Sequence, residues 1–207
     1  MVKKVLWLLM ALLSVFIGLY PSQFFMAEKK AGILKLKPDA LFLNPFWQAG
    51  FYVHIILGGL ALLIGWVQFS SWIRSRSLQF HRLTGKVYVT AVLLSAVSGF
   101  YIAFYASGGV PAKLGFMTLS CVWFCTTVMG YIRIKNGQVE QHKNLMIYSY
   151  ACCFAAVTLR LWMPLLIKIF GDFGTAYSVV AWWCWVPNLA VAYLLTRKRA
   201  VAISVEY

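Results

Sequence analysis

Six apolar stretches, each about as long as a membrane-spanning helix, account for most of this chain. They are residues 5–26, 47–72, 83–106, 114–132, 145–169 and 176–195. A helix needs roughly 20 apolar residues to cross the ~30 Å of hydrocarbon in a bilayer. Only 12% of the 207 residues are charged, whereas a soluble domain carries roughly a quarter. The sequence therefore predicts one all-α domain, an integral membrane bundle of six transmembrane helices, and leaves no room for a soluble domain.

The lysines and arginines indicate how this bundle is oriented, because positively charged connections stay on the cytoplasmic side. With a cytoplasmic N-terminus, twelve basic residues fall on that side and six on the other; the nineteenth, Arg160, lies inside the fifth stretch. We therefore predict both termini in the cytoplasm of a bacterial inner membrane, with the first stretch retained as a helix and not cleaved as a signal peptide. The cytoplasmic set is Lys3, Lys4, Arg74, Arg76, Arg82, Lys86, Arg133, Lys135, Lys143, Arg197, Lys198 and Arg199; the outer set is Lys29, Lys30, Lys35, Lys37, Lys113 and Lys168.

The net charge of +14 is interpreted in the same way. Basic residues near a membrane surface attract anionic lipid head groups, and here they are scattered over the membrane edges. They form no soluble basic patch of the kind that binds nucleic acid. The expected partners are therefore membrane lipids, with other membrane subunits as a further option, but not nucleic acid.

Each of the three histidines begins a helical face of small residues. Spacings of three and four keep side chains on one side of a helix. Ionisable groups inside lipid are rare and usually functional, so these faces predict a polar interior. The first face is His54, Gly58, Ala61, Gly65 and Gln68; the second is His81, Gly85, Tyr88, Val92, Ser95 and Gly99; the third is His142, Met146, Ser149, Cys153, Ala156 and Arg160. The ends of the third face are about five helical turns apart and are expected to point the same way.

Arg160 has no acidic residue within any of the six stretches to pair with. Its guanidinium must therefore meet carbonyls, water, an aromatic ring or a bound anion, or extend toward the outer head groups. One interpretation is snorkelling or stacking on a tryptophan at similar depth. The other is that it holds an anionic ligand, such as a lipid phosphate, a heme propionate or a quinone oxygen. The tryptophans considered are Trp162, Trp182, Trp183 and Trp185.

Counting along the helices separates the polar groups into two layers. Gln68, His81, Arg82 and His142 lie near the cytoplasmic edge, and His54 and Arg160 lie toward the outer side. A b-type heme held between helices needs two imidazoles at one depth, a condition that His81 and His142 meet and His54 does not. We predict a cofactor site built from these six residues, with His81 and His142 as the ligands of one heme iron. A metal site with Gln68 or Glu140 as a weak third ligand, proton handling and simple cross-helix hydrogen bonds remain alternatives.

The cysteines and the one long connection add little. Cys121, Cys125, Cys152, Cys153 and Cys184 all lie in the apolar stretches, and we interpret them as small buried residues and not as disulfides or a metal cluster. The connection 27–46 carries Pro38 and Pro45 and is expected on the outer side, with room for a short interfacial helix.

Several motifs resemble those of one known family. They are the run from His81 to Tyr88, the run from His142 to Met146, Ser149 to Ala151, Phe154 to Leu161, and Trp185 to Leu189. Together they resemble the bacterial membrane family catalogued as domain-of-unknown-function family 2306, over roughly residues 54–193. The resemblance implies a compact multi-helix inner-membrane protein whose characteristic residues are the histidines, the motif around Arg160, and Asn188. It implies no particular activity.

Two classes of function are consistent with these patterns. In the first, the chain is a small inner-membrane protein that binds one b-type heme or a quinone in membrane electron transfer, with Arg160 orienting an anionic group. In the second, it is a non-enzymatic lipid-binding or accessory scaffold subunit, whose polar faces pack against one another or against a partner. The sequence contains no nucleotide-binding loop, which counts against the redox class. No carboxylate lies within the six stretches to carry protons, so a proton or ion transporter is disfavoured.

Overall fold

The computed structural model describes the backbone of residues 2–26, 34 and 37–205, and the side chains of residues 4–25, 34 and 37–197. In this part of the chain the structure is helical, without strands. Six helical segments are long and apolar enough to cross a membrane, which confirms the predicted fold class. The elements are α1 (Val2–Leu19), η1 (Tyr20–Ser22), α2 (Gln23–Met26), α3 (Asp39–Phe42), α4 (Pro45–Gly65), η3 (Trp66–Phe69), α5 (Ser71–Arg76), α6 (Leu78–Ala103), α7 (Gly109–Lys135), α8 (Val139–Cys153), α9 (Ala155–Phe170), α10 (Phe173–Trp183) and α11 (Val186–Val205).

The observed helices begin earlier than the apolar stretches predict. The third, fourth and fifth spans begin at Leu78, Gly109 and Val139, five or six residues before the predicted starts at 83, 114 and 145. Capping explains the first of these differences, because the Ser77 hydroxyl accepts a hydrogen bond from the Phe80 amide at 3.1 Å and starts α6 within polar sequence. The hydropathy of the sequence indicates which residues contact lipid, whereas the capping residues determine where a helix begins.

The connections also contain more helix than expected. The predicted cytoplasmic link 73–82 is mostly α5 and the first turn of α6. In the predicted outer connection, α3 is a short helix of the kind anticipated there, and α4 already begins at Pro45, capped by the Asn44 side chain. Residues 27–33, 35 and 36 of this connection lie outside the described residues.

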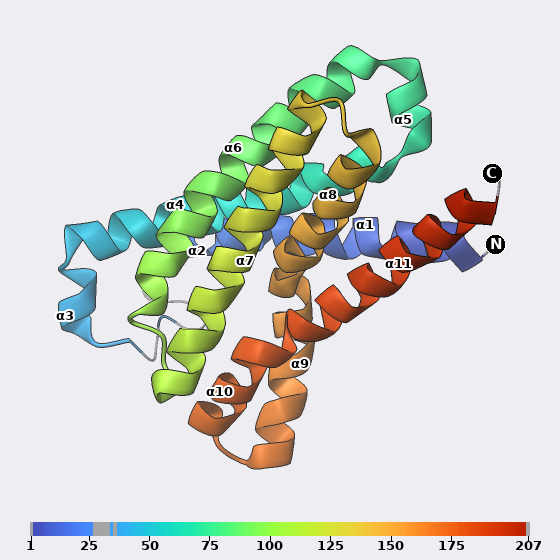
Figure 1. Ribbon diagram of the computed structural model, residues 1–207. Helices are drawn as coiled ribbons and strands as arrows, with labels where there is room; N and C mark the ends of the chain where they lie inside the picture. The colour runs from blue at the N-terminus through green and yellow to red at the C-terminus, as the bar shows by residue number, and fades with distance from the viewer. Residues whose placement is uncertain (1, 27–33, 35–36, 206–207) are drawn as a thin grey trace.

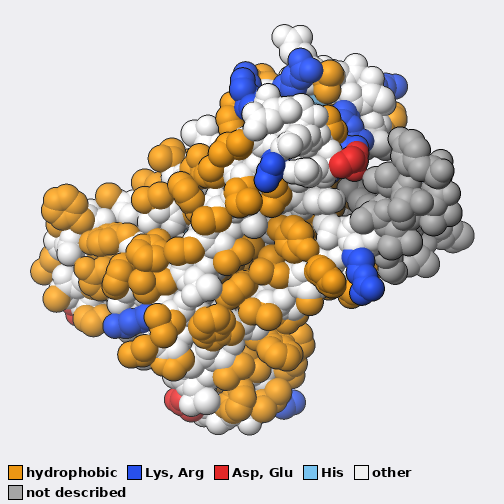
Figure 2. Space-filling view, viewed as in Figure 1, with side chains coloured by type: hydrophobic (Ala, Val, Ile, Leu, Met, Phe, Trp, Pro, Cys, Tyr) orange, Lys and Arg blue, Asp and Glu red, His pale blue; other side chains and the backbone are white. Residues whose placement is uncertain are grey.

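The bundle is built on α4, α6, α7 and α8, which pack in that order (Figure 1). α1 packs against α4, α10 packs against both α7 and α9, and α11 packs against α8. Figure 1 shows both chain ends, α5 and the α7–α8 turn toward one end of the bundle, with α3 and the α9–α10 turn at the other. Figure 2 shows apolar side chains over the middle of the molecule and Lys and Arg gathered at the α5 end. Membrane-spanning helices with this surface contact lipid.

The fifth and sixth spans are each interrupted partway along their length. The fifth bends at Phe154, between α8 and α9, and the sixth breaks at Cys184 and Trp185, between α10 and α11. Asn188 satisfies the carbonyls freed at both breaks: its Nδ2 donates to the Ala151 oxygen at 3.2 Å and to the Cys184 oxygen at 2.9 Å. Inserting a side chain into a helical hydrogen-bond ladder is a known cause of such bends.

This interruption changes the third predicted face. The sequence places His142 and Arg160 on one straight face, but they lie on two helices with different neighbours. α8 packs on α7 and α11, whereas α9 packs on α10 and α1. The two side chains therefore belong to different parts of the bundle.

A buried hydrogen-bonded network fills the middle of the bundle. The Tyr88 and Ser149 hydroxyls are 2.9 Å apart, Ser149 is 2.7 Å from the Thr127 hydroxyl, and none of these three residues is more than 1% exposed. Beside them the Tyr150 hydroxyl is 2.8 Å from the Ser14 hydroxyl. This network fixes α1, α6, α7 and α8 relative to one another, since each hydroxyl would otherwise be an unpaired group in a dry environment.

Candidate functional site

His54 is held in one orientation by α6. Its Nδ1 lies 2.9 Å from the Ser95 carbonyl oxygen, and the Ser95 hydroxyl donates in return to the His54 carbonyl oxygen at 3.0 Å. A carbonyl oxygen can only accept, so Nδ1 carries the hydrogen. In the neutral imidazole the remaining nitrogen, Nε2, is then a hydrogen-bond acceptor or a metal ligand.

Gly99 makes room for the imidazole. A Cβ at position 99 would lie 2.7 Å from Nδ1 and 2.8 Å from Cε1 of His54, closer than any real contact. The glycine therefore permits the close approach of α4 and α6 at this depth. His54 is nine residues after Pro45, where α4 begins, or about 14 Å along the helix axis.

A cavity of about 210 Å³ lies beside His54. Three of the residues that line it, Trp47, Phe51 and His54, come from one face of α4, because they follow the spacing i, i+4 and i+7. Ser120 and Lys37 add further polar groups. The remaining lining residues are Leu34, Gly99, Ile102, Ala103, Ala106, Phe116, Leu119, Leu159 and Tyr177. The cavity is thus mostly apolar and aromatic, with a small number of polar side chains.

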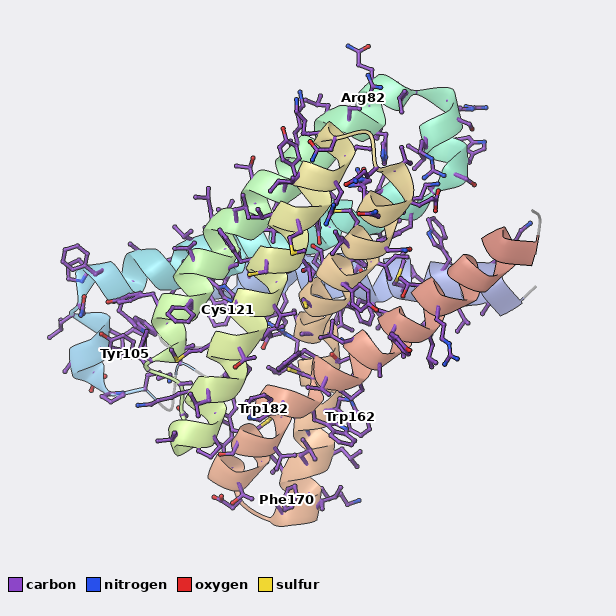
Figure 3. The ribbon with its side chains drawn as sticks, viewed as in Figure 1. Arg82, Tyr105, Cys121, Trp162, Phe170 and Trp182 are labelled. Atoms are coloured by element: carbon purple, nitrogen blue, oxygen red, sulfur yellow. The ribbon has the colours of Figure 1, made fainter. Side chains whose placement is uncertain are left out.

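Two lysines lie at the α3 side of this cavity. The Lys37 ammonium donates to the Tyr105 carbonyl oxygen and to the Ser107 hydroxyl. Burial, and to a smaller extent the nearby charge of Lys113, lowers the pKa of Lys37 below its usual value. Lys113 lines a second hollow of about 410 Å³, and Ala106 belongs to the walls of both. The two hollows therefore adjoin, on the side where Tyr105 is labelled in Figure 3.

Trp47, one of the residues that line the cavity, has an unsatisfied hydrogen-bond donor. The residue is only 3% exposed, and its indole ring stacks on Phe51 with 5.3 Å between ring centroids and 12° between planes. Its Nε1 hydrogen has no acceptor within the described part of the chain. Leaving a buried N–H unpaired costs about 1–3 kcal/mol, so this donor requires an explanation.

Arg160 stacks on a partner that the sequence interpretation did not include. Its Cζ lies 4.1 Å above the ring centroid of Tyr20, in η1, and its Nη1 donates to the Ala156 carbonyl oxygen at 2.7 Å. Aromatic stacking was one of the predicted environments, but the aromatic ring is that of Tyr20 and not of a tryptophan. Trp162 instead contacts Trp183, and Trp182 donates to the Pro111 carbonyl oxygen; Figure 3 labels Trp162 and Trp182 near α9 and α10.

The side chain of Arg160 also points back along α9, toward the bend between α8 and α9. Ala156 lies one turn earlier in α9, so the guanidinium is directed back toward the middle of the span. It is close enough to His54 to interact with it electrostatically. His54 and Arg160, the predicted outer pair, therefore lie in the same region of the bundle, although each has its own hydrogen-bond partner.

The structure brings together only some of the four residues predicted near the cytoplasmic edge, which are Gln68, His81, Arg82 and His142. His142 is oriented like His54, with Nδ1 2.8 Å from the Gly130 carbonyl oxygen and Nε2 left over. His81 lies within electrostatic range of His142 and Arg82. Gln68 donates instead to the Thr84 hydroxyl at 2.6 Å, and Arg82 is exposed where α6 begins (Figure 3). The described residues include no group of three or more His, Cys, Asp or Glu side chains suited to a metal ion.

The sequence did not predict the aromatic residues that line the cavity beside His54. Trp47, Phe51 and Tyr177 resemble ordinary core residues, and Ser120 stood outside every predicted face. One signal was available, since Trp47, Phe51 and His54 share a helical face. The cysteines behave as expected in part: Cys152, Cys153 and Cys184 are buried, Cys121 and Cys125 are exposed, and all five are free.

The chain is similar to one family of membrane proteins. A family model described as a predicted membrane protein, DUF2306, matches residues 51–196. Neither the curated proteins nor the solved structures provide a significant match.

Proposed function

Since the chain belongs to the DUF2306 family of predicted membrane proteins, we propose that it works within the bilayer, binding an aromatic ring of the quinol class beside His54. The observation that carries this proposal is the orientation of His54. Its Nδ1 is committed to Ser95, so the polar atom that His54 offers to the cavity is Nε2, an acceptor. A ring hydroxyl is the complementary donor.

The rest of the cavity supports a flat apolar ligand. Phe51, Phe116 and Tyr177 line it, and aromatic walls favour offset or edge contacts with a bound ring. At about 210 Å³ the cavity is smaller than the roughly 300 Å³ at which drug-sized pockets begin. It therefore suits one ring system, with any hydrophobic tail left in lipid.

The first prediction tests this ligand with 1,4-naphthohydroquinone, kept reduced under anaerobic conditions and titrated calorimetrically into purified protein. We expect the native protein to bind it and His54→Leu to bind it about tenfold more weakly, the loss of one good hydrogen bond. Gly99→Ala should weaken binding as much, because its methyl group displaces the imidazole.

Gly85→Ala is the matched control, since a Cβ there meets only the Gln68 Oε1 at 3.5 Å, an ordinary contact. It should bind the probe like the native protein. Equal binding by native protein and His54→Leu would contradict the proposal, as would no binding by the native protein.

A second candidate, a single b-type heme held by His81 and His142, is favoured by the orientation of His142. The Gly130 carbonyl fixes Nδ1 of His142 and leaves Nε2 available to an iron. Gly85 lies one turn after His81, where the absence of a side chain leaves more room beside the imidazole than any other residue would. Such a heme would supply one-electron redox chemistry near the cytoplasmic edge, and with it a role in membrane electron transfer.

The second prediction concerns this heme. Protein purified from heme-replete cells and reduced should show a b-type visible spectrum, and both His81→Ala and His142→Ala should abolish it. His54→Ala, which removes the imidazole at the other depth, should leave the spectrum unchanged. A colourless native protein would remove heme from consideration. If the quinol probe also fails to bind, the lipid-binding or scaffold function becomes the better explanation.

The proposed setting is a cytoplasmic membrane with both termini in the cytoplasm, as the distribution of Lys and Arg indicates. In that orientation α5 and the α7–α8 turn face the cytoplasm, and α3 faces the outside. The His54 cavity then adjoins the outer hollow beside Lys113, and the His81 and His142 pair lies near the cytoplasmic edge.

A further inference from the structure

Building on the proposed function, we propose that Trp47 donates a hydrogen bond from Nε1 to a second oxygen of the ligand, so that the cavity selects rings with oxygens on opposite edges. His54 and Trp47 would then hold the two ends of one ring. This assigns a specificity-determining role to a side chain that otherwise looks like apolar packing.

The unpaired indole N–H of Trp47 is the first observation that supports this role. Among the described residues, the indole N–H groups of Trp47, Trp66 and Trp123 are buried without an acceptor. Of these three, Trp47 is the one that lines the cavity beside His54. Buried donors are nearly always paired in native proteins, and a ligand oxygen in this cavity would provide the missing acceptor.

The spacing of the two groups is the second support. Trp47 and His54 are seven residues apart on one face of α4, which places their Cα atoms two turns, or about 10.5 Å, apart along the axis. A six-membered ring with para oxygens has about this length once a hydrogen bond is added at each end. Phe51 lies between them on the same face, stacked on Trp47, where it would contact the ring.

The two polar groups are also chemically complementary to such a ring. His54 Nε2 accepts, and Trp47 Nε1 can only donate. A hydroquinone offers a hydroxyl hydrogen to the first and a lone pair on its other oxygen to the second. A ring with a single hydroxyl satisfies His54 and leaves the indole unpaired, and analogues that leave a site's buried polar group unpaired are discriminated against.

The third prediction compares 1,4-naphthohydroquinone with 1-naphthol, two ligands of the same ring system that differ in the second oxygen. Calorimetric titration of the native protein should give about tenfold tighter binding of the hydroquinone, the value of one hydrogen bond. Trp47→Phe keeps an aromatic ring but removes the N–H, and it should bind both probes with the affinity that native protein has for 1-naphthol. Trp66→Phe and Trp123→Phe, which also remove an unpaired N–H but lie outside the cavity, should keep the tenfold preference.

The preference is a ratio measured on one preparation, so partial unfolding of a variant does not change it. Equal binding of both probes by native protein would overturn the role of Trp47 while leaving the quinol proposal standing, and so would a preference that survives in Trp47→Phe. Failure of native protein to bind either probe would instead overturn the proposed function itself. His54→Leu distinguishes the two claims further, because it should weaken both probes and not only the hydroquinone.

Discussion

Gly65→Ala is expected to destabilise the folded protein by about 2 kcal/mol or more. A Cβ at position 65 would lie 2.4 Å from Cε2 and 2.6 Å from Cδ2 of Tyr150, and 2.9 Å from Cε2 of Tyr88. Both rings are buried and hydrogen-bonded, Tyr88 to Ser149 and Tyr150 to Ser14, so neither can turn aside without breaking the central network. The measurement is the free energy of unfolding in mixed micelles, from SDS titration followed by far-ultraviolet circular dichroism.

Gly85→Ala provides the opposite expectation in the same assay. Its new methyl group makes only an ordinary contact with Gln68, so the higher helix propensity of alanine, up to about 1 kcal/mol over glycine, acts alone. The two substitutions should therefore change stability in opposite directions. If Gly65→Ala were as stable as native protein, the close packing of α4 against these tyrosines would be refuted.

The fold was predictable because lipid imposes a simple rule. In hydrocarbon, backbone N–H and C=O groups must hydrogen-bond to each other, which a helix achieves internally. Stretches of about 20 apolar residues therefore identified all six spans. What the hydropathy pattern could not identify was the interruption at Phe154. The Ala151 carbonyl at that bend accepts a hydrogen bond from Asn188, which lies far along the sequence and reaches Ala151 only through the packing of α11 on α8.

The candidate site was predictable only within one helix at a time. Helical spacing correctly grouped Ser95 with Gly99, and both contact His54. Spacing does not set which faces of different helices meet, however. Sequence and depth favour a tryptophan as the partner of Arg160, whereas the packing of α9 on α1 brings Tyr20 to it. Helix rotation, which decides such pairings, is fixed by packing and not by the period of apolar residues.

Asn188→Leu is expected to cost about 2 kcal/mol of stability, because it removes the side-chain donor of the Ala151 carbonyl, whereas the Cys184 carbonyl also accepts from the Thr158 hydroxyl. The Asn188 Nδ2 donates to the carbonyl oxygens of Ala151 and Cys184 and lies 3.1 Å from the Thr158 hydroxyl. Hydrogen bonds between membrane helices are worth about 0.6 kcal/mol on average, but a buried acceptor left unpaired costs about 1–3 kcal/mol. The Ala151 carbonyl lies at the bend, so the larger figure applies to it. The same SDS titration measures the loss.

Asn144→Leu is the matched control for this substitution. Asn144 lies on α8, and its Oδ1 is buried with no hydrogen-bond partner among the residues that the structure describes, so leucine there removes an unsatisfied acceptor. We expect Asn144→Leu to be neutral or slightly stabilising, since replacing an unpaired buried polar group by an apolar one relieves a desolvation cost. Similar stability of Asn188→Leu and native protein would show that the two interruptions do not depend on Asn188. A loss confined to Asn188→Leu would instead identify this side chain as the link between the fifth and sixth spans, next to the α9 wall of the His54 cavity.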